Sequence, residues 1–438
     1  MKKSLLGLGA VAIAASGGLW RFVLLAGRDA PPSDDGEFVV EQAEIAPADN
    51  AFTYFLDATN LLVETTNRQT AADFLAGKAA DDGFLREWVA QNAACLAQVR
   101  RGTECAACWM PTVLAFDTEF PYLTAWLDIG RVLATQARQA RLAGRPVEAA
   151  EAALTAARMG NLVLKHAEST IHYWVGLALA TQGLDALLDV AGESAATAEW
   201  AQALEELGPF DEGLARALKA ECRYEAHLVE QLAGGEIHWL DLLGLGNARH
   251  DFRAWVLGIV QQPGYFFQPH ATRRSLQDVY RRMIRDVALP FARIDLTDGR
   301  VFGLGWTDWL RPNAFGRALR TLLIPPVGLT MEKKCRIESL RAGAQLVVAC
   351  NRFEQARGRR PETLAELVPE FLKAVPRDPY DGEPFRYSVE KGLVWAVGKN
   401  LTDEGGSTQV SGSDKEYVAS RDRPKAEDFV FALRAKKP

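Results

Sequence analysis

The chain has 438 residues and a formal net charge of −6, a length typical of about two or three domains. Hydrophobic residues make up 48% of it, which excludes a wholly disordered chain. Basic pairs such as Arg273-Arg274 are interspersed with acidic residues, whereas a protein that binds nucleic acid needs a clustered positive face. We therefore expect no nucleic-acid partner.

Residues 1–28 have the pattern of a signal anchor. Lys2 and Lys3 precede a long apolar run whose only charged residue is Arg21, and the run just suffices to cross a bilayer as a helix. A signal peptide cleaved at Ala12-Ile13-Ala14 is the alternative, but the apolar run continues beyond that point. We expect an uncleaved, single-pass inner-membrane anchor, with the bulk of the chain periplasmic or otherwise extracytoplasmic.

A large α-helical domain is predicted to follow. Residues 29–50 are rich in Pro and Asp and are interpreted as a linker, and residues 51–330 are predicted to be overwhelmingly helical. In 123–143, apolar residues recur every three or four positions, as in an amphipathic helix. The next helix carries small residues on one face, so we expect its neighbour to approach closely. Further helices are predicted at 171–191, 197–207, 211–233 and 271–290.

The first two of these helices resemble a tetratricopeptide unit. The matching residues are Trp126, Ile129, Gly130 and Leu133 in the first helix and Ala149 and Ala156 in the second. The first helix is about two turns too long for that repeat, and the sequence has no second copy at a fixed period. The resemblance implies a helical pair with a peptide groove, and plain helical packing is the alternative. The order of segments in 51–330 also resembles uncharacterised, membrane-anchored helical proteins of planctomycete and verrucomicrobial type.

The six cysteines could oxidise in an exported protein. Cys105 and Cys108 form a Cys-x-x-Cys pair, but Trp109 stands where haem attachment needs a histidine. No second ligand pair with zinc spacing lies nearby in the sequence. We expect either a local disulfide, using Cys95 and one member of the pair, or buried thiols.

Common catalytic signatures are missing from the sequence. It contains no Gly-x-Ser-x-Gly elbow, no His-Glu-x-x-His and no phosphate loop of the Gly-x-x-x-x-Gly-Lys-Ser/Thr type. The six histidines are scattered without a ligand-like spacing. These observations favour a protein that is not an enzyme, and no catalytic residue is predicted.

A second, small α+β unit is predicted at 331–438. A long helix ending at Gly358 is followed by a Thr363-x-x-Glu366 capping box. Alternating apolar residues then predict three strands of an antiparallel sheet, at 385–389, 393–398 and 428–433. The fold class expected for the whole chain is therefore mainly α, with an N-terminal anchor, a large helical domain and this small C-terminal unit.

This unit resembles the globular part of type II secretion major pseudopilins, which are pilin-like proteins. The matching residues are Pro361, Thr363, Leu364, Asp378, Pro379, Tyr380, Gly382, Pro384, Tyr387, Gly398, Asp403, Glu404, Gly405, Gly406, Asp428, Phe429 and Val430. Pseudopilins also carry a glutamate five residues into an N-terminal apolar helix, and this chain lacks it. The unit also lies at the far end of the chain. The resemblance therefore implies a fused pilin-like module that does not assemble into a fibre.

The same resemblance implies a calcium site in the loop after the hairpin. The candidate ligands are Asp403, Asn400, Glu404 and Ser407, with Asp414 from the next stretch. Calcium prefers six to eight oxygen ligands, which such a loop could supply. The alternative is that these residues only stabilise a long turn.

Two functional hypotheses follow. The first is a non-catalytic, membrane-anchored cell-envelope protein that acts as an interaction or scaffold component with protein partners, linked to a type II secretion or pilus-like system. The alternative is an envelope hydrolase or polysaccharide-binding protein, with a groove lined by the aromatic residues of 237–270 and 300–310.

Overall fold

The structure is a computed structural model that describes residues 27–65, 67–113, 118–242, 261–296, 307–407 and 428–433. It is mainly helical, with a small antiparallel sheet near the C-terminus, which confirms the coarse fold class. The predicted anchor, residues 1–28, lies outside the described residues except for its last two positions.

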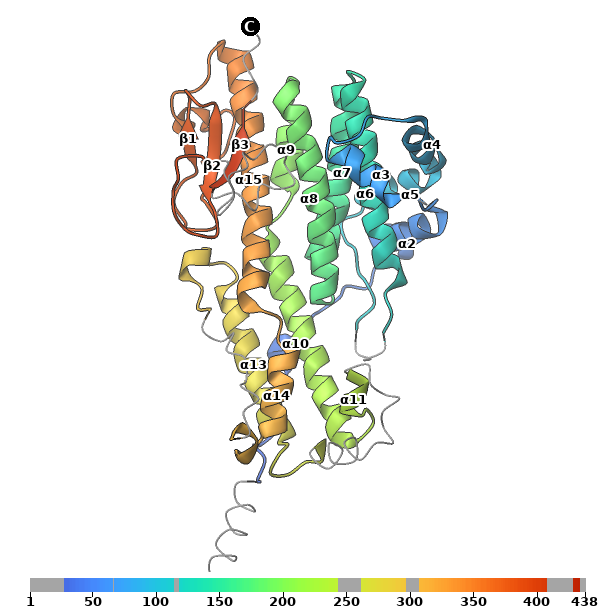
Figure 1. The fold of residues 1–438 in the computed structure, drawn as a ribbon, viewed down its shortest axis with the longest axis vertical. Helices are drawn as coiled ribbons and strands as arrows, with labels where there is room; N and C mark the ends of the chain where they lie inside the picture. The colour runs from blue at the N-terminus through green and yellow to red at the C-terminus, as the bar shows by residue number, and fades with distance from the viewer. Residues whose placement is uncertain are drawn as a thin grey trace, which may run out of the picture.

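Four short helices form the N-terminal layer and pack around a longer one (Figure 1). They are α2 (Ala51–Leu61), α3 (Arg68–Leu75), α4 (Gly83–Gln91) and α5 (Ala93–Thr103), and the longer helix is α6 (Pro121–Leu142). Side-chain oxygens of Asn50, Asn67 and Asp82 accept hydrogen bonds from the first turns of α2, α3 and α4. Such caps satisfy backbone donors that a helix leaves unpaired at its N-terminus.

Glycines set the packing of the next two helices, α7 (Pro146–Lys165) and α8 (Thr170–Glu193). A Cβ atom on Gly183 of α8 would lie 2.5 Å from the carbonyl oxygen of Ala153. On α7, a Cβ on Gly160 would lie 2.6 Å from the carbonyl oxygen of Gly176. The two backbones therefore touch, which confirms the close approach expected from the small residues of the second helix.

The remaining helices extend the body around this pair (Figure 1). They are α9 (Ala198–Glu206), α10 (Phe210–Gly234), α11 (Trp239–Leu242), α13 (Pro269–Asp286) and α14 (Ala314–Leu323). Short 3-10 turns lie at η1 (Gly36–Phe38), η2 (Pro47–Asp49), η4 (Phe291–Arg293), η6 (Asp308–Leu310) and η7 (Leu364–Leu367). The helices predicted between 171 and 290 are present, with bounds that differ by a few residues.

The C-terminal part consists of one long helix and three strands. The helix is α15 (Val327–Arg357), and the strands are β1 (Arg386–Ser388), β2 (Leu393–Val397) and β3 (Asp428–Ala432). The strands are antiparallel in the order β1-β2-β3, with Arg386 opposite Trp395 and Val394 opposite Phe431. Gly358 ends α15 with φ 69°, and the capping box of Thr363 and Glu366 is present, as expected.

Helix α15 packs against the sheet on one side and against α8, α9 and α10 on the other (Figure 1). Phe431 of β3 lies over Gly343, where an added Cβ would clash with the ring. One hydrophobic cluster includes residues of α7, α8, α10, α15 and the sheet. The domain boundary at 330/331 stays a prediction. It assigns α15 to the second unit, although α15 contacts both the sheet and the helical body.

The first part of the segment interpreted as a linker, residues 29–37, lies along α13. The Asp29 carboxylate accepts hydrogen bonds from the backbone N–H groups of His270 and Ala271, at 2.8 and 2.9 Å. Asp35 forms an ion pair with Arg273, and Phe38 is 1% exposed. These contacts fix the segment to the first turns of the helix.

Helix α8 is the one described helix that is long and apolar enough to cross a membrane by length and composition, and 61% of its apolar window is buried inside the protein. All six cysteines are free thiols: Cys105 is half-buried and the others are buried. Of the two alternatives expected for the cysteines, the structure shows thiols.

The packing of α7 on α8 predicts opposite effects for two Gly→Ala changes in the same helix. Gly183→Ala forces a methyl group into the α7 backbone and should destabilise the protein by about 1–3 kcal/mol. Gly192→Ala meets no atom within 4 Å and should stabilise it by about 0.5–1 kcal/mol. Thermal unfolding of both variants checks this, and equal melting temperatures would contradict the close packing.

Candidate functional site

The predicted calcium loop follows β2, and its central carboxylate is already hydrogen-bonded. Asp403 Oδ1 accepts from the indole Nε1 of Trp395 and from the backbone N–H of Gly405, both at 2.9 Å. Its Oδ2 lies 3.6 Å from Nε of Arg386. Although burial opposes it, these hydrogen bonds lower the pKa of Asp403 below its usual value.

The other predicted ligands also have partners within the protein. Asn400 donates a hydrogen bond to Glu404 Oε1 at 2.7 Å. The backbone N–H of Ser407 donates to the buried carboxylate of Asp428 at 2.9 Å, so that β3 holds the end of the loop. Asp414 lies outside the described residues. The structure thus brings Asp403, Asn400, Glu404 and Ser407 into one loop.

A guanidinium group lies at the centre of the carboxylates around this loop. Arg386 of β1 forms ion pairs with Asp378, at 2.6 Å, and with Asp381, in addition to its contact with Asp403. Asp378 is 1% exposed and also accepts hydrogen bonds from the backbone N–H groups of Tyr380 and Val397, at 2.8 and 2.7 Å. Burial raises the pKa of Asp378 to about 7 despite these bonds.

The described residues do not by themselves fit a calcium ion. Arg386 already lies next to Asp403 and compensates part of the negative charge that would attract a divalent cation. Within the described ranges, no group of three or more His, Cys, Asp or Glu side chains is arranged to hold a metal. A calcium site would therefore need further oxygen ligands, such as the predicted Asp414, and it stays a prediction.

Metal removal tests this prediction directly. If calcium binds through Asp403, EDTA should lower the melting temperature of the full chain, and Asp403→Ala should abolish the difference between samples with and without EDTA. Glu390→Ala changes an exposed acid outside the predicted ligand set and should leave the EDTA effect intact. A melting temperature that does not change on chelation would contradict calcium binding by this loop.

The role of Arg386 can be tested independently of any metal. Arg386→Gln leaves Asp378, Asp381 and Asp403 without their shared counter-charge and should destabilise the protein by about 3–5 kcal/mol. Arg377→Gln removes an exposed arginine from the same segment and should change stability by less than about 0.5 kcal/mol. Denaturant unfolding of both variants distinguishes them, and similar losses would contradict a central role for Arg386.

The aromatic segments of the alternative hypothesis are only partly described. Trp239 packs edge-on against Phe315, and Phe267, which is 0% exposed, packs against the same ring at 5.1 Å. Trp306 lies outside the described residues, as does the side chain of Trp309. An aromatic-lined groove for polysaccharide stays a prediction.

One serine–histidine contact has the atoms of a nucleophile and base. Ser169 Oγ lies 2.9 Å from Nδ1 of His172, whose Nε2 lies 2.9 Å from the hydroxyl of Tyr122. Ser169 also caps α8, and His172 is 0% exposed. Burial lowers the pKa of His172 to about 4. The Ser169 hydroxyl accepts a hydrogen bond from the backbone N–H of His172, and both side chains are buried, so the geometry of this contact is that of a helix cap.

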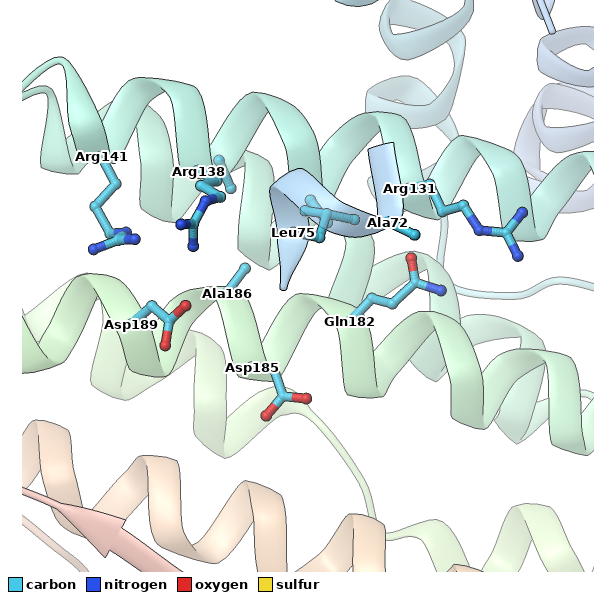
Figure 2. A pocket seen from close by; sticks show the side chains of 11 residues that line it. Ala72, Leu75, Arg131, Arg138, Arg141, Gln182, Asp185, Ala186 and Asp189 are labelled. Atoms are coloured by element: carbon cyan, nitrogen blue, oxygen red, sulfur yellow. The ribbon is translucent and has the colours of Figure 1, made fainter. Parts of the chain in front are cut away.

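A groove between α6 and α8, which is also lined by α3, has a volume of about 230 Å³. Figure 2 shows three arginines of α6 along one edge, opposite side chains of α8. Its lining residues are Ala72, Leu75, Arg131, Ala134, Ala137, Arg138, Arg141, Gln182, Asp185, Ala186 and Asp189. The lining therefore combines charged groups of α6 and α8 with apolar alanine and leucine side chains.

The three arginines of the groove differ in their partners. Arg131 forms an ion pair with Asp128, and Arg141 forms one with Glu193. Arg138 lies over the ring of Phe74, 5.1 Å from its centroid, and its Nε is buried without a hydrogen-bond partner. Burial and the neighbouring Arg141 lower the pKa of Arg138, and Asp189 opposes that shift. Arg138 is thus the guanidinium of this groove with an unsatisfied donor.

Sequence reasoning missed this groove, although one signal was present. Arginines at 131, 138 and 141 repeat at helical spacing on the predicted helix of 123–143. A solvent-exposed helix face has the same pattern, so the sequence alone does not indicate a groove. The facing aspartates at 185 and 189 belong to another helix, and only the packing of α6 on α8 brings the two sets together.

Comparison with known proteins gives no assignment: no family model, no curated protein and no solved structure matches the chain. The class that the structure defines is therefore a mainly helical protein with a small antiparallel sheet, an arginine-centred C-terminal loop and a charged groove.

Proposed function

We propose that this protein is a non-catalytic scaffold of the cell envelope, anchored in the inner membrane by residues 1–28. Its pilin-like module would present a surface to protein partners of a type II secretion or pilus-like system. The observation that carries the proposal is the burial of α15, which makes the module a fixed part of a larger body. The resemblance to pseudopilins supplies the link to such a system.

A helix that assembles into a fibre with copies of itself needs an exposed face. On α15, the exposed residues are Leu329 near its start and Gln355, Ala356 and Arg357 at its end. The rest of the helix is buried or half-buried between the sheet and the helical body. This supports a single fused module and argues against a fibre subunit.

Contacts made by the segment after the predicted anchor support the proposal that the helical body is held close to the membrane. Asp29, the first residue beyond the predicted anchor, is bound to the N-terminus of α13, and Glu37 pairs with Arg281 of the same helix at 2.6 Å. A flexible linker would let the body move away from the bilayer. These contacts would instead keep α13 next to the membrane surface and orient the module relative to it.

Site-specific photo-crosslinking in intact envelopes tests the scaffold proposal. A photoreactive residue at Val389 or at Leu401, which are 40% and 41% exposed on the module, should capture the same envelope protein. A residue at Phe84 on α4, 40% exposed and remote from the module, serves as the matched control and should not capture that protein. Mass spectrometry identifies the product.

The decisive outcome is the identity of the captured protein. One partner that is common to both module positions and missing from the control supports a docking surface. Capture of different proteins at each position, or of none from native envelopes, overturns the proposal. Long polymers of the chain itself in crosslinked envelopes would overturn the argument from α15.

A further inference from the structure

We propose that two loops, residues 262–268 and 307–312, insert into the headgroup layer of the membrane that holds the anchor, at anionic phospholipids. Phe266 and Leu310 would enter the boundary between headgroups and acyl chains, with arginines next to them at the headgroups. We call these two segments the tip loops. This inference rests on the anchor of the proposed function and adds a second contact with lipid, made by the helical body itself.

The tip loops lie where the predicted anchor meets the body. Asp29 directly follows residue 28, the last of the predicted anchor, and its carboxylate accepts hydrogen bonds from the backbone N–H groups of His270 and Ala271 at the start of α13. Consecutive Cα atoms are about 3.8 Å apart, so no free length of chain separates residue 28 from this contact. The first tip loop ends at the residue that precedes α13. Helices α13 and α14 lie at the end of the body remote from the sheet (Figure 1).

Hydrogen bonds join the two tip loops into one surface. The hydroxyl of Tyr265 donates to the carbonyl of Leu310 at 2.7 Å. The carbonyls of Tyr265 and Phe266 accept from backbone N–H groups around the start of α14, at 2.8 and 2.9 Å. An unpaired carbonyl is costly where water is excluded. Because these three carbonyls already have donors, the tip loops can enter the bilayer interface without that cost.

Two large apolar side chains are exposed on this surface. Leu310 is 63% exposed and Phe266 is 39% exposed, whereas the neighbouring Phe267 belongs to the hydrophobic cluster beneath them. The ring of Tyr265 packs edge-on against Phe266, with 5.3 Å between the centroids. Leucine and aromatic side chains are typical of protein surfaces that lie in the membrane interface. An exposed apolar pair next to a membrane anchor therefore fits a lipid surface.

The charges next to this apolar pair fit anionic headgroups. Arg28, Arg274 and Arg311 are exposed. The side chain of Arg311 is 71% exposed and lies 3.9 Å from Asp308, and an exposed ion pair at such a distance contributes little. The carboxylate of Asp29 is already bound by the first backbone N–H groups of α13. Exposed positive charge therefore remains beside Phe266 and Leu310, and basic residues at a membrane surface attract anionic lipids.

Photo-crosslinking of the full chain in vesicles tests this contact. The vesicles contain an equimolar mixture of phosphatidylcholine and phosphatidylglycerol, and a photoreactive residue replaces Phe266 or Leu310. Each position should give lipid adducts at a yield at least about tenfold above that at Leu142, as counted by mass spectrometry. Leu142 is the matched control because it is 56% exposed and ends α6, at the opposite end of the body from α13 and α14 (Figure 1). Equal melting temperatures of the substituted chains show that the fold is kept.

The lipid masses in the adducts test the choice of headgroup. Adducts at Leu310 should contain phosphatidylglycerol at least about threefold more often than phosphatidylcholine, because of the neighbouring arginines. Combining Arg274→Gln with Arg311→Gln should abolish this preference. Arg145→Gln removes an arginine that pairs with Glu148 at the start of α7 and should leave the preference unchanged.

Extraction of the vesicles with alkaline carbonate distinguishes this contact from the anchor. If the chain stays in the vesicles but the yields at Phe266 and Leu310 do not exceed the yield at Leu142, the lipid contact is overturned and the anchor is not. Release of the chain by carbonate overturns the anchor and the lipid contact together. Equal labelling of the two phospholipids overturns the choice of anionic headgroups. In native envelopes, protein adducts in place of lipid adducts at both positions would assign the tip loops to a protein partner and overturn the proposal.

Discussion

The structure depends on one helix, α15, which is covered on both sides. On the side of the helical body, its polar residues serve as partners for the ends of other helices. Asn351 donates a hydrogen bond to the carbonyl of Ala191 at the end of α8, and Gln345 donates one to Leu204 at the end of α9. A helix leaves its last carbonyls unpaired, so α15 satisfies groups that would otherwise be buried without partners. The opposite side carries the sheet.

The elements themselves could be predicted from the sequence, because their signals are local. Apolar spacing gave the helices between 123 and 290, and the capping box of Thr363 and Glu366 located the short turn after α15. The sequence predicted that α15 starts at residue 331, four residues later than its actual start at Val327. The N-cap residue Pro326 has no side-chain cap that could mark this start in the sequence. Local patterns also cannot show which of two faces a polar residue such as Asn351 covers.

The candidate sites could be predicted only in part, because both depend on contacts between distant residues. The composition of the loop shows that many side-chain oxygens lie close together in the sequence. It could not indicate that Arg386 would lie among them, since strand register sets that residue opposite Trp395, whose indole also binds Asp403. In the groove, the rotation of α6 about its axis decides which arginines face α8. No pattern within one helix contains that information.

The cover on both sides of α15 also has a consequence for synthesis on the ribosome. Gly343 must receive Phe431, which is translated after it, while Asn351 must reach Ala191, which is made much earlier. The nascent chain therefore cannot close its main hydrophobic cluster until β3 emerges. Until then the apolar side of α15 is exposed, and such surfaces favour aggregation during folding. The chain therefore needs protection from aggregation until β3 has docked.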